Sequence, residues 1–126
     1  MPDRTVHFFE SVQLALINYF NFQGRSSRGA FWYFVLATFA FSILLSMLSY
    51  ITNPELLITI SAIYHVLIII PYLALKVRRL HDVNKSGWWI LIAFTGVGYF
   101  LLLYWYCLKG TLGANYYGED IEAGRS

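Results

Sequence analysis

A short basic segment between two long uncharged runs constrains this chain more than any other feature. Residues 76–89 hold four of the nine Lys and Arg residues within ten positions and end in the pair Trp88-Trp89. Loops on the cytoplasmic side of a membrane are enriched in Lys and Arg, and Trp rings favour the headgroup level. The segment therefore predicts a cytosolic loop that joins two membrane-spanning helices, which also places the N-terminus in the cytosol.

The composition supports a single membrane domain over residues 1–126. The chain is 58% hydrophobic and 13% charged, against about 45–50% and about 25% in ordinary soluble domains. A soluble fold of this size could not bury so much apolar surface, whereas a bilayer removes the need. The net charge of +2 is too small to argue for nucleic acid, and the basic residues lie at the ends of apolar runs, where anionic headgroups would be.

Three apolar segments predict an all-α integral membrane protein. Residues 30–51 and 56–75 contain no Asp, Glu, Lys or Arg, and each supplies the roughly 20 residues that a spanning helix needs. The third segment, 87–108, is interrupted by Thr95-Gly96-Val97-Gly98. It is either one kinked span, which places the C-terminus outside, or a re-entrant hairpin, whose halves would each be about 15 Å long. Length permits both, and we favour the single kinked span.

The two ends of the chain lie outside these three segments. On a helix over residues 6–22, polar and apolar side chains would gather on opposite sides. That pattern predicts an amphipathic helix lying in the membrane interface. Residues 109–126 form a polar tail whose Gly and Asn residues indicate turns rather than helix.

Arginine residues beside the predicted spans are the strongest candidates for a binding face. Arg78 and Arg79 are four and three residues before Asp82, so either could pair with it on a helix. A guanidinium group also suits phosphate geometry. The candidate face for anionic lipid or a partner membrane protein comprises Arg25, Arg28, Arg78, Arg79, His81, Asp82 and Trp88. The plain alternative is that these charges only hold the loop inside.

Residues suited to catalysis or metal binding are sparse. His81 is next to Asp82, but adjacent residues do not face each other on a helix, and no nucleophile accompanies them. The three His residues are in separate segments and Cys107 is the only cysteine, so we expect no enzyme activity, metal site or cofactor. His65 lies within the second span and is a candidate intramembrane polar site, because ionisable groups there usually face a bundle interior or a water cavity.

Three motifs resemble those of the bacterial domain-of-unknown-function 805 family, small inner-membrane proteins of the YhaH type. They are Gly24-Arg25…Ser27-Arg28…Phe31-Trp32, then Arg78-Arg79-Leu80-His81-Asp82…Ser86-Gly87-Trp88-Trp89, then Gly110-Thr111…Gly113…Asn115-Tyr116-Tyr117-Gly118. The resemblance implies a bacterial inner-membrane protein with few spans and no accepted activity. It adds a candidate tail site at Asn115 and Gly118, which would join the arginines only if the third segment is a hairpin. Thr95-Gly96 replaces a proline that is common in the family, which predicts a softer kink.

These observations favour a non-enzymatic binding or scaffold module over a transporter. It would engage anionic lipid or a partner membrane protein through its cytosolic face. The alternative is a subunit of a small oligomeric transporter or channel. Asp and Glu are absent from all three apolar segments, although a coupled transporter would usually need one, and three spans could enclose a pore only in a homo-oligomer.

Overall fold

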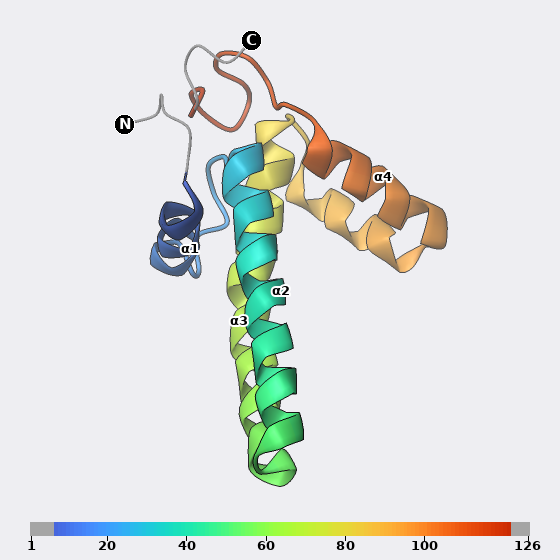
Figure 1. The fold of residues 1–126 in the computed structure, drawn as a ribbon. Coiled ribbons are helices and arrows are strands. Elements are labelled where there is room, and N and C mark those ends of the chain that lie inside the picture. Colours follow the sequence, from blue (N-terminus) through green and yellow to red (C-terminus); the bar gives the residue numbers. More distant parts are fainter. Residues whose placement is uncertain (1–6, 122–126) are drawn as a thin grey trace.

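The structure, a computed structural model, describes residues 7–121, where the regular elements are helices joined by loops, with one isolated bridge in the tail. Its elements are α1 (Phe8–Ile17), α2 (Arg28–Ile51), α3 (Pro54–Asp82), the 3₁₀ helix η1 (Gly87–Phe94) and α4 (Gly96–Cys107). Helices α2 and α3 form a long antiparallel hairpin (Figure 1). Near one end, α1 packs on one side of it and the pair η1–α4 extends from the other. We call this the charged end, and the opposite one the turn end.

Side-chain caps set the limits of the two long helices. The hydroxyl of Ser27 accepts the backbone N–H of Ala30 at 3.1 Å and starts α2. The carboxamide oxygen of Asn53 accepts the N–H of Leu56 at 3.2 Å and starts α3. The predicted run 30–51 is confirmed as helix. Helix α3 continues seven residues beyond the predicted limit of 56–75 and includes three of the four basic residues of 76–89.

Both long helices are apolar on surfaces that the protein does not cover. Only 17% of the most apolar window of α2 and 6% of that of α3 are buried, whereas the core helix of a soluble protein would be mostly buried. At 1.5 Å per residue the helices are about 36 Å and about 43 Å long, which exceeds a hydrocarbon core of about 30 Å. Each is therefore long and apolar enough to cross a membrane.

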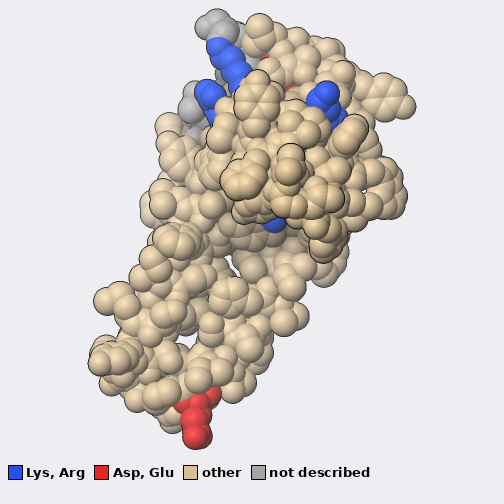
Figure 2. Space-filling view, turned by 90° about the vertical axis from the view of Figure 1, so that its right-hand side faces the viewer, with Lys and Arg blue, Asp and Glu red and all other residues tan. Residues whose placement is uncertain are grey.

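Charge is confined to the ends of this hairpin. No Lys or Arg occurs between Arg28 and Lys76. On the face drawn in Figure 2, Lys and Arg atoms lie toward the charged end and a large acidic group lies at the turn end, with uncharged surface between them. Glu55 is in the first turn of α3, at that turn end.

Helix α1 is shorter than the predicted helix over 6–22, of which residue 6 lies outside the described residues. It ends at Ile17, where the backbone and the carboxamide of Asn18 both donate to the carbonyl of Leu14. Its small side chains Ser11 and Ala15 are buried, while Phe9 is 83% exposed. One side of the helix therefore packs on the protein through Ser11 and Ala15, while Phe9 faces outward.

The third apolar segment is a helical hairpin, so the predicted single kinked span is wrong. Gly87, at the start of η1, packs so closely on Val77 that an added Cβ would lie 2.8 Å from its side chain. At the other end of the segment, Cys107 accepts a hydrogen bond from Arg28 at 3.1 Å. Val77 and Arg28 are both at the charged end, so η1 leaves it and α4 returns to it (Figure 1).

Thr95 makes the turn of this hairpin tight rather than soft. Its hydroxyl donates to the carbonyl of Ile92 at 2.8 Å and accepts the N–H of Gly98 at 3.0 Å. One side chain thus ends η1 and caps α4. The softer kink expected from Thr95-Gly96 is not observed, because the threonine hydroxyl supplies contacts that a proline could not.

Gly98 is expected to be essential to this turn, and Gly96 is not. A Cβ at Gly98 would overlap the carbonyl oxygen of Ile92 and lie 2.5 Å from the hydroxyl of Thr95, whereas one at Gly96 would meet nothing within 4 Å. We expect Gly98→Ala to lower the free energy of unfolding by about 1–3 kcal/mol. Gly96→Ala, the matched control, should leave it unchanged or raise it slightly. Denaturant unfolding in micelles measures both, and equal values would contradict this account of the turn.

The hydrophobic core lies at the charged end of the α2–α3 hairpin. It is formed by buried residues from every α-helix: Ala15, Phe31, Phe34, Leu75, Leu80, Leu102 and Tyr106. Trp32 packs against it and donates its ring N–H to the carbonyl of Tyr106 at 3.0 Å. This core anchors α4 beside α2 and brings the end of the third segment next to the arginines.

Candidate functional site: a buried arginine–aspartate cluster

The charged end contains a buried Arg–Asp cluster, made of Arg25, Arg78, Arg79 and Asp82. The carboxylate of Asp82 pairs with Nε and Nη2 of Arg25 at 2.9 Å each and with Nη1 of Arg79 at 2.5 Å. The side chains of these three residues are at most 1% exposed. Of the two pairs that helical spacing allowed, Arg79–Asp82 therefore forms, while Arg78 takes other partners.

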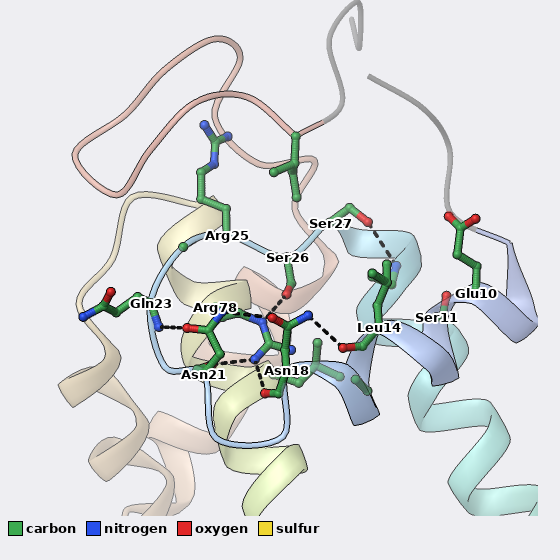
Figure 3. A pocket seen from close by; sticks show the side chains of 15 residues that line it. Glu10, Ser11, Leu14, Asn18, Asn21, Gln23, Arg25, Ser26, Ser27 and Arg78 are labelled. Carbon is green, nitrogen blue, oxygen red and sulfur yellow. Dashed lines mark hydrogen bonds between the residues drawn. The ribbon is translucent and has the colours of Figure 1, made fainter. Parts of the chain in front are cut away.

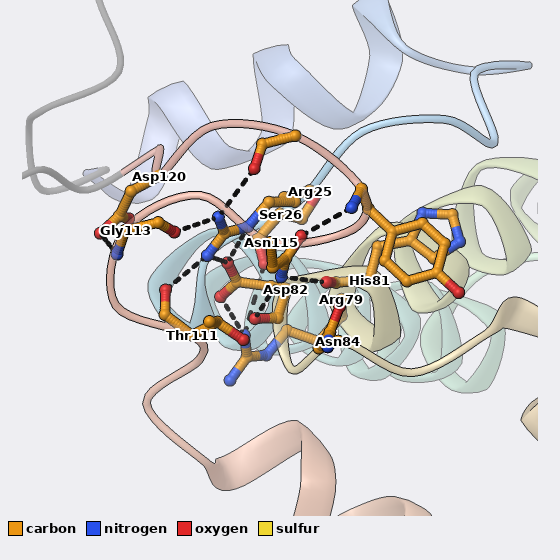
Figure 4. Close-up of polar contacts among 12 residues, drawn as sticks. Arg25, Ser26, Arg79, His81, Asp82, Asn84, Thr111, Gly113, Asn115 and Asp120 are labelled. Carbon is orange, nitrogen blue, oxygen red and sulfur yellow. Dashed lines mark hydrogen bonds and ion pairs between the residues drawn. The ribbon is translucent and has the colours of Figure 1, made fainter.

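The remaining donors of Arg25 and Arg79 hold the end of the chain. Nη2 and Nη1 of Arg25 donate to the carbonyls of Thr111 at 2.6 Å and Gly113 at 2.8 Å, as Figure 4 shows. Arg79 donates to the carbonyl of Tyr106 at 3.2 Å and also to that of Leu108. The cluster thus connects the segment before α2, the last turn of α3, the end of α4 and the tail.

Arg78 points to the other side of α3 and closes the loop after α1. Its Nε donates to the hydroxyl of Ser26 at 2.9 Å, and Nη1 donates to the carbonyls of Asn18 at 3.1 Å and Asn21 at 2.6 Å (Figure 3). These oxygen atoms replace the water that burial removes.

The tail covers the last turn of α3. The carboxamide of Asn115 donates to the carbonyl of His81 at 2.9 Å, and the N–H of Thr111 donates to that of Asp82 at 2.7 Å. The ring of His81 stacks on Tyr117 with centroids 4.0 Å apart and donates from Nδ1 to the carbonyl of Gly24 at 2.8 Å.

The predicted site residues therefore come together in part, but not as an exposed face. Most of them are buried and use their polar side-chain atoms within the protein: Arg25, Arg78, Arg79, His81 and Asp82. Arg28 and Trp88 are exposed. The tail does reach the cluster: Asn115 donates to the carbonyl of His81, and the carbonyl of Gly118 accepts from Arg25 Nη1 at 3.3 Å. The condition for this, a hairpin in the third segment, is met.

His65 is exposed rather than buried. It lies far from the charged end, and its Nδ1 contacts the carbonyl of Ser61 at 2.8 Å, one turn earlier in α3. The expectation that it faces a bundle interior is not met in one chain.

A polar pocket of about 450 Å³ lies beside the cluster, between α1, the loop 18–27 and α3. Figure 3 shows Glu10, Asn18, Ser26 and Arg78 around it. Carboxylate, carboxamide, hydroxyl and guanidinium groups thus share one wall, which suits a small polar group. Within residues 7–121, no three His, Cys, Asp or Glu side chains are arranged to hold a metal ion.

Several contacts of this site leave little signal in the sequence. Thr111, Gly113 and Leu108 act through backbone carbonyls, which every residue type carries. The side chain of Ser26 accepts from Arg78 and its carbonyl accepts from Arg79, two roles that no sequence pattern indicates. The Gly and Asn residues of the tail were the one usable sign that it is ordered.

Comparison with known proteins finds relatives that are named as inner membrane proteins. The family described as "Protein of unknown function (DUF805)" matches residues 19–119. Inner membrane protein YhaI of Escherichia coli K12 is 37% identical over 110 residues, which cover 86% of this chain and 92% of that protein. Inner membrane protein YhaH of the same strain is 33% identical over 111 residues, covering 83% and 90%. No solved structure matches the chain. The chain has two helices able to cross a membrane, and its relatives are named as inner membrane proteins. Because the family match covers most of its length, the chain belongs to the DUF805 family.

Proposed function

We propose that the protein is a non-enzymatic scaffold that binds anionic lipid in the cytosolic leaflet of a bacterial inner membrane. Helices α2 and α3 would cross the bilayer, with the charged end and the N-terminus in the cytosol. The distribution of Lys and Arg supports this orientation, because positive residues are retained on the cytosolic side and none occurs between Arg28 and Lys76.

The observation that carries the proposal is the η1–α4 hairpin. The longer of its two helices has 12 residues, about 18 Å, which is too short to cross a core of about 30 Å. Large apolar side chains remain exposed on both helices, among them Trp88, Phe94 and Phe100 at 79%, 88% and 71%. A single leaflet would cover this surface while the Arg–Asp cluster holds the base of the hairpin at the headgroup level.

The lipid-facing cations would be those exposed at the base of the η1–α4 hairpin. Arg28 and Lys109 are exposed at the base of the hairpin, whereas Arg25, Arg78 and Arg79 hold the protein together. A basic side chain near an anionic leaflet contributes about 1 kcal/mol of attraction. His81 has a structural hydrogen bond to Gly24, which supports a role without catalysis.

Lipid preference in nanodiscs tests the proposal. We expect the purified protein to retain phosphatidylglycerol over phosphatidylcholine from an equal mixture, and added salt to weaken this preference. The double variant Arg28→Gln/Lys109→Gln should lower the ratio about fivefold or more. Glu55→Gln, at the turn end, is the control and should leave it unchanged. Native mass spectrometry counts the lipids, and a wild-type protein without preference would refute the proposal.

A second candidate function, a subunit of an oligomeric channel or transporter, is favoured by His65. An ionisable side chain exposed to lipid within a span is costly, and a neighbouring copy could cover it. We would then expect an oligomer in nanodiscs of native lipid, measured by mass photometry, that His65→Leu disrupts. A monomer would remove this candidate.

A further inference from the structure

A second cavity lies between the η1–α4 hairpin and the long helices, apart from the polar pocket. It has a volume of about 460 Å³, within the usual range for ligand sites of about 300–1,000 Å³. Its walls are aromatic or aliphatic, with Trp32 and Val35 from α2, Tyr72 from α3 and Phe94 from η1, and they contain one charged group, the ammonium of Lys76. We call it the hairpin groove.

Lys76 is a half-buried cation in this apolar setting. Its Nζ lies 5.3 Å from the centroid of the Tyr72 ring. Within residues 7–121 no carboxylate pairs with it, since Asp82 is used by Arg25 and Arg79. A charged group removed from water is stabilised chiefly by an opposite charge. An anion beside Lys76 would therefore supply what the described part of the protein does not.

The hairpin groove has a polar end and an apolar end. Tyr72 and Leu73 precede Lys76 by four and three residues on α3, so they lie about 5–6 Å further from the charged end. An occupant would thus meet a cation near the headgroup level and mainly aromatic and aliphatic side chains deeper in. This order matches the phosphate and the acyl chain of a phospholipid.

Another apolar groove serves as an internal comparison. It lies between α1 and the long helices, has about 530 Å³, and is lined by Val12, Phe34 and Phe41 among others, with no Lys or Arg. It can take a hydrocarbon chain but has no group that would hold a phosphate. The hairpin groove therefore differs by the cation, not by its size.

We propose that the hairpin groove binds one anionic phospholipid, with its phosphate on the ammonium of Lys76 and an acyl chain between the hairpin and the α2–α3 pair. This inference rests on the proposed function and gives it a specific site. Binding in the hairpin groove should depend less on salt than the headgroup attraction at Arg28 and Lys109, because a half-buried ion pair is screened by salt much less than an exposed one.

Retention of phosphatidylglycerol after extensive detergent washing at high salt tests the site. We expect one lipid per wild-type chain, about tenfold weaker retention in Lys76→Met, and retention close to wild type in Lys76→Arg. Lys85→Met is the matched control, because the Nζ of Lys85 is also 5.3 Å from an aromatic ring, that of Trp105, but Lys85 does not line the groove. It should retain the lipid.

Filling each groove gives an independent arm. Ala93 lines the hairpin groove and Ala40 the other one, and both are exposed alanines. Ala93→Trp should displace the retained lipid, whereas Ala40→Trp should keep it. Thermal unfolding close to that of wild type shows that each variant is folded.

The outcomes separate the site from the proposed function. A wild-type protein with no preference for phosphatidylglycerol at any salt concentration would overturn both. Salt-sensitive preference that depends on Arg28, together with undiminished retention in Lys76→Met, would overturn the site alone. Displacement of the retained lipid by inorganic phosphate would show a site for free anions and would also overturn it.

Discussion

Asp82→Asn should destabilise the protein more than any other single change of a charged residue at the charged end. The carboxylate balances two guanidinium groups, Arg25 and Arg79, whose side chains are 1% and 0% exposed. Removing one partner of a buried ion pair leaves an uncompensated charge and typically costs about 3–5 kcal/mol. Asparagine keeps the size of the side chain, so a large loss would report the charge. Denaturant unfolding in micelles measures it.

The same variant should also loosen the tail, because Arg25 holds Thr111 and Gly113 through its other donors. We expect hydrogen exchange at the amides of residues 110–120 to be faster than in wild type. Glu55→Gln removes an exposed carboxylate at the turn end and should change stability by less than about 0.5 kcal/mol. A loss below about 1 kcal/mol for Asp82→Asn would show that Asp82 does not organise the cluster.

Local rules predicted much of the fold. The uncharged runs predicted α2 and most of α3 because a spanning helix needs a long apolar segment. A serine at position 26 or 27 was a possible cap for the first of them, and Ser27 is the one that caps it. The three-residue spacing of Arg79 and Asp82 predicted a pair that does form. Each of these features depends on residues close together in the sequence, where helical periodicity alone decides which side chains meet.

The η1–α4 hairpin and the burial of the arginines depend on contacts that cannot be predicted from helical periodicity. Two half-segments of about ten residues fit a kinked span and a hairpin equally well. The hydroxyl of Thr95 and the close approach of Gly98 to Ile92 decide between them. Arg25 and Arg79 donate to carbonyls about 86 and 27 residues away in the sequence. The sequence therefore predicted a lipid-binding face from these arginines, whereas in the structure they form a buried cluster.

Labelling of three single-cysteine variants, which shows the side of the membrane on which each residue lies, tests the fold most directly. In a Cys107→Ser background we would introduce Glu55→Cys at the turn end, Lys85→Cys after α3 and Glu119→Cys in the tail. A membrane-impermeant maleimide should label Glu55→Cys in intact spheroplasts, and should label the other two only after lysis. The expected difference is all or none, because a bilayer either separates reagent and thiol or does not.

The relation among the three sites matters more than any one of them. The tail hydrogen-bonds to the last turn of α3, so Lys85→Cys and Glu119→Cys must behave alike, and Glu55→Cys must behave in the opposite way. If Glu55→Cys were protected while the other two were labelled, the proposed orientation would be reversed but the hairpin would stand. If Glu119→Cys were labelled in intact spheroplasts and Lys85→Cys were not, the third segment would cross the bilayer, and neither the tail contacts of the Arg–Asp cluster nor the hairpin groove could exist in the membrane.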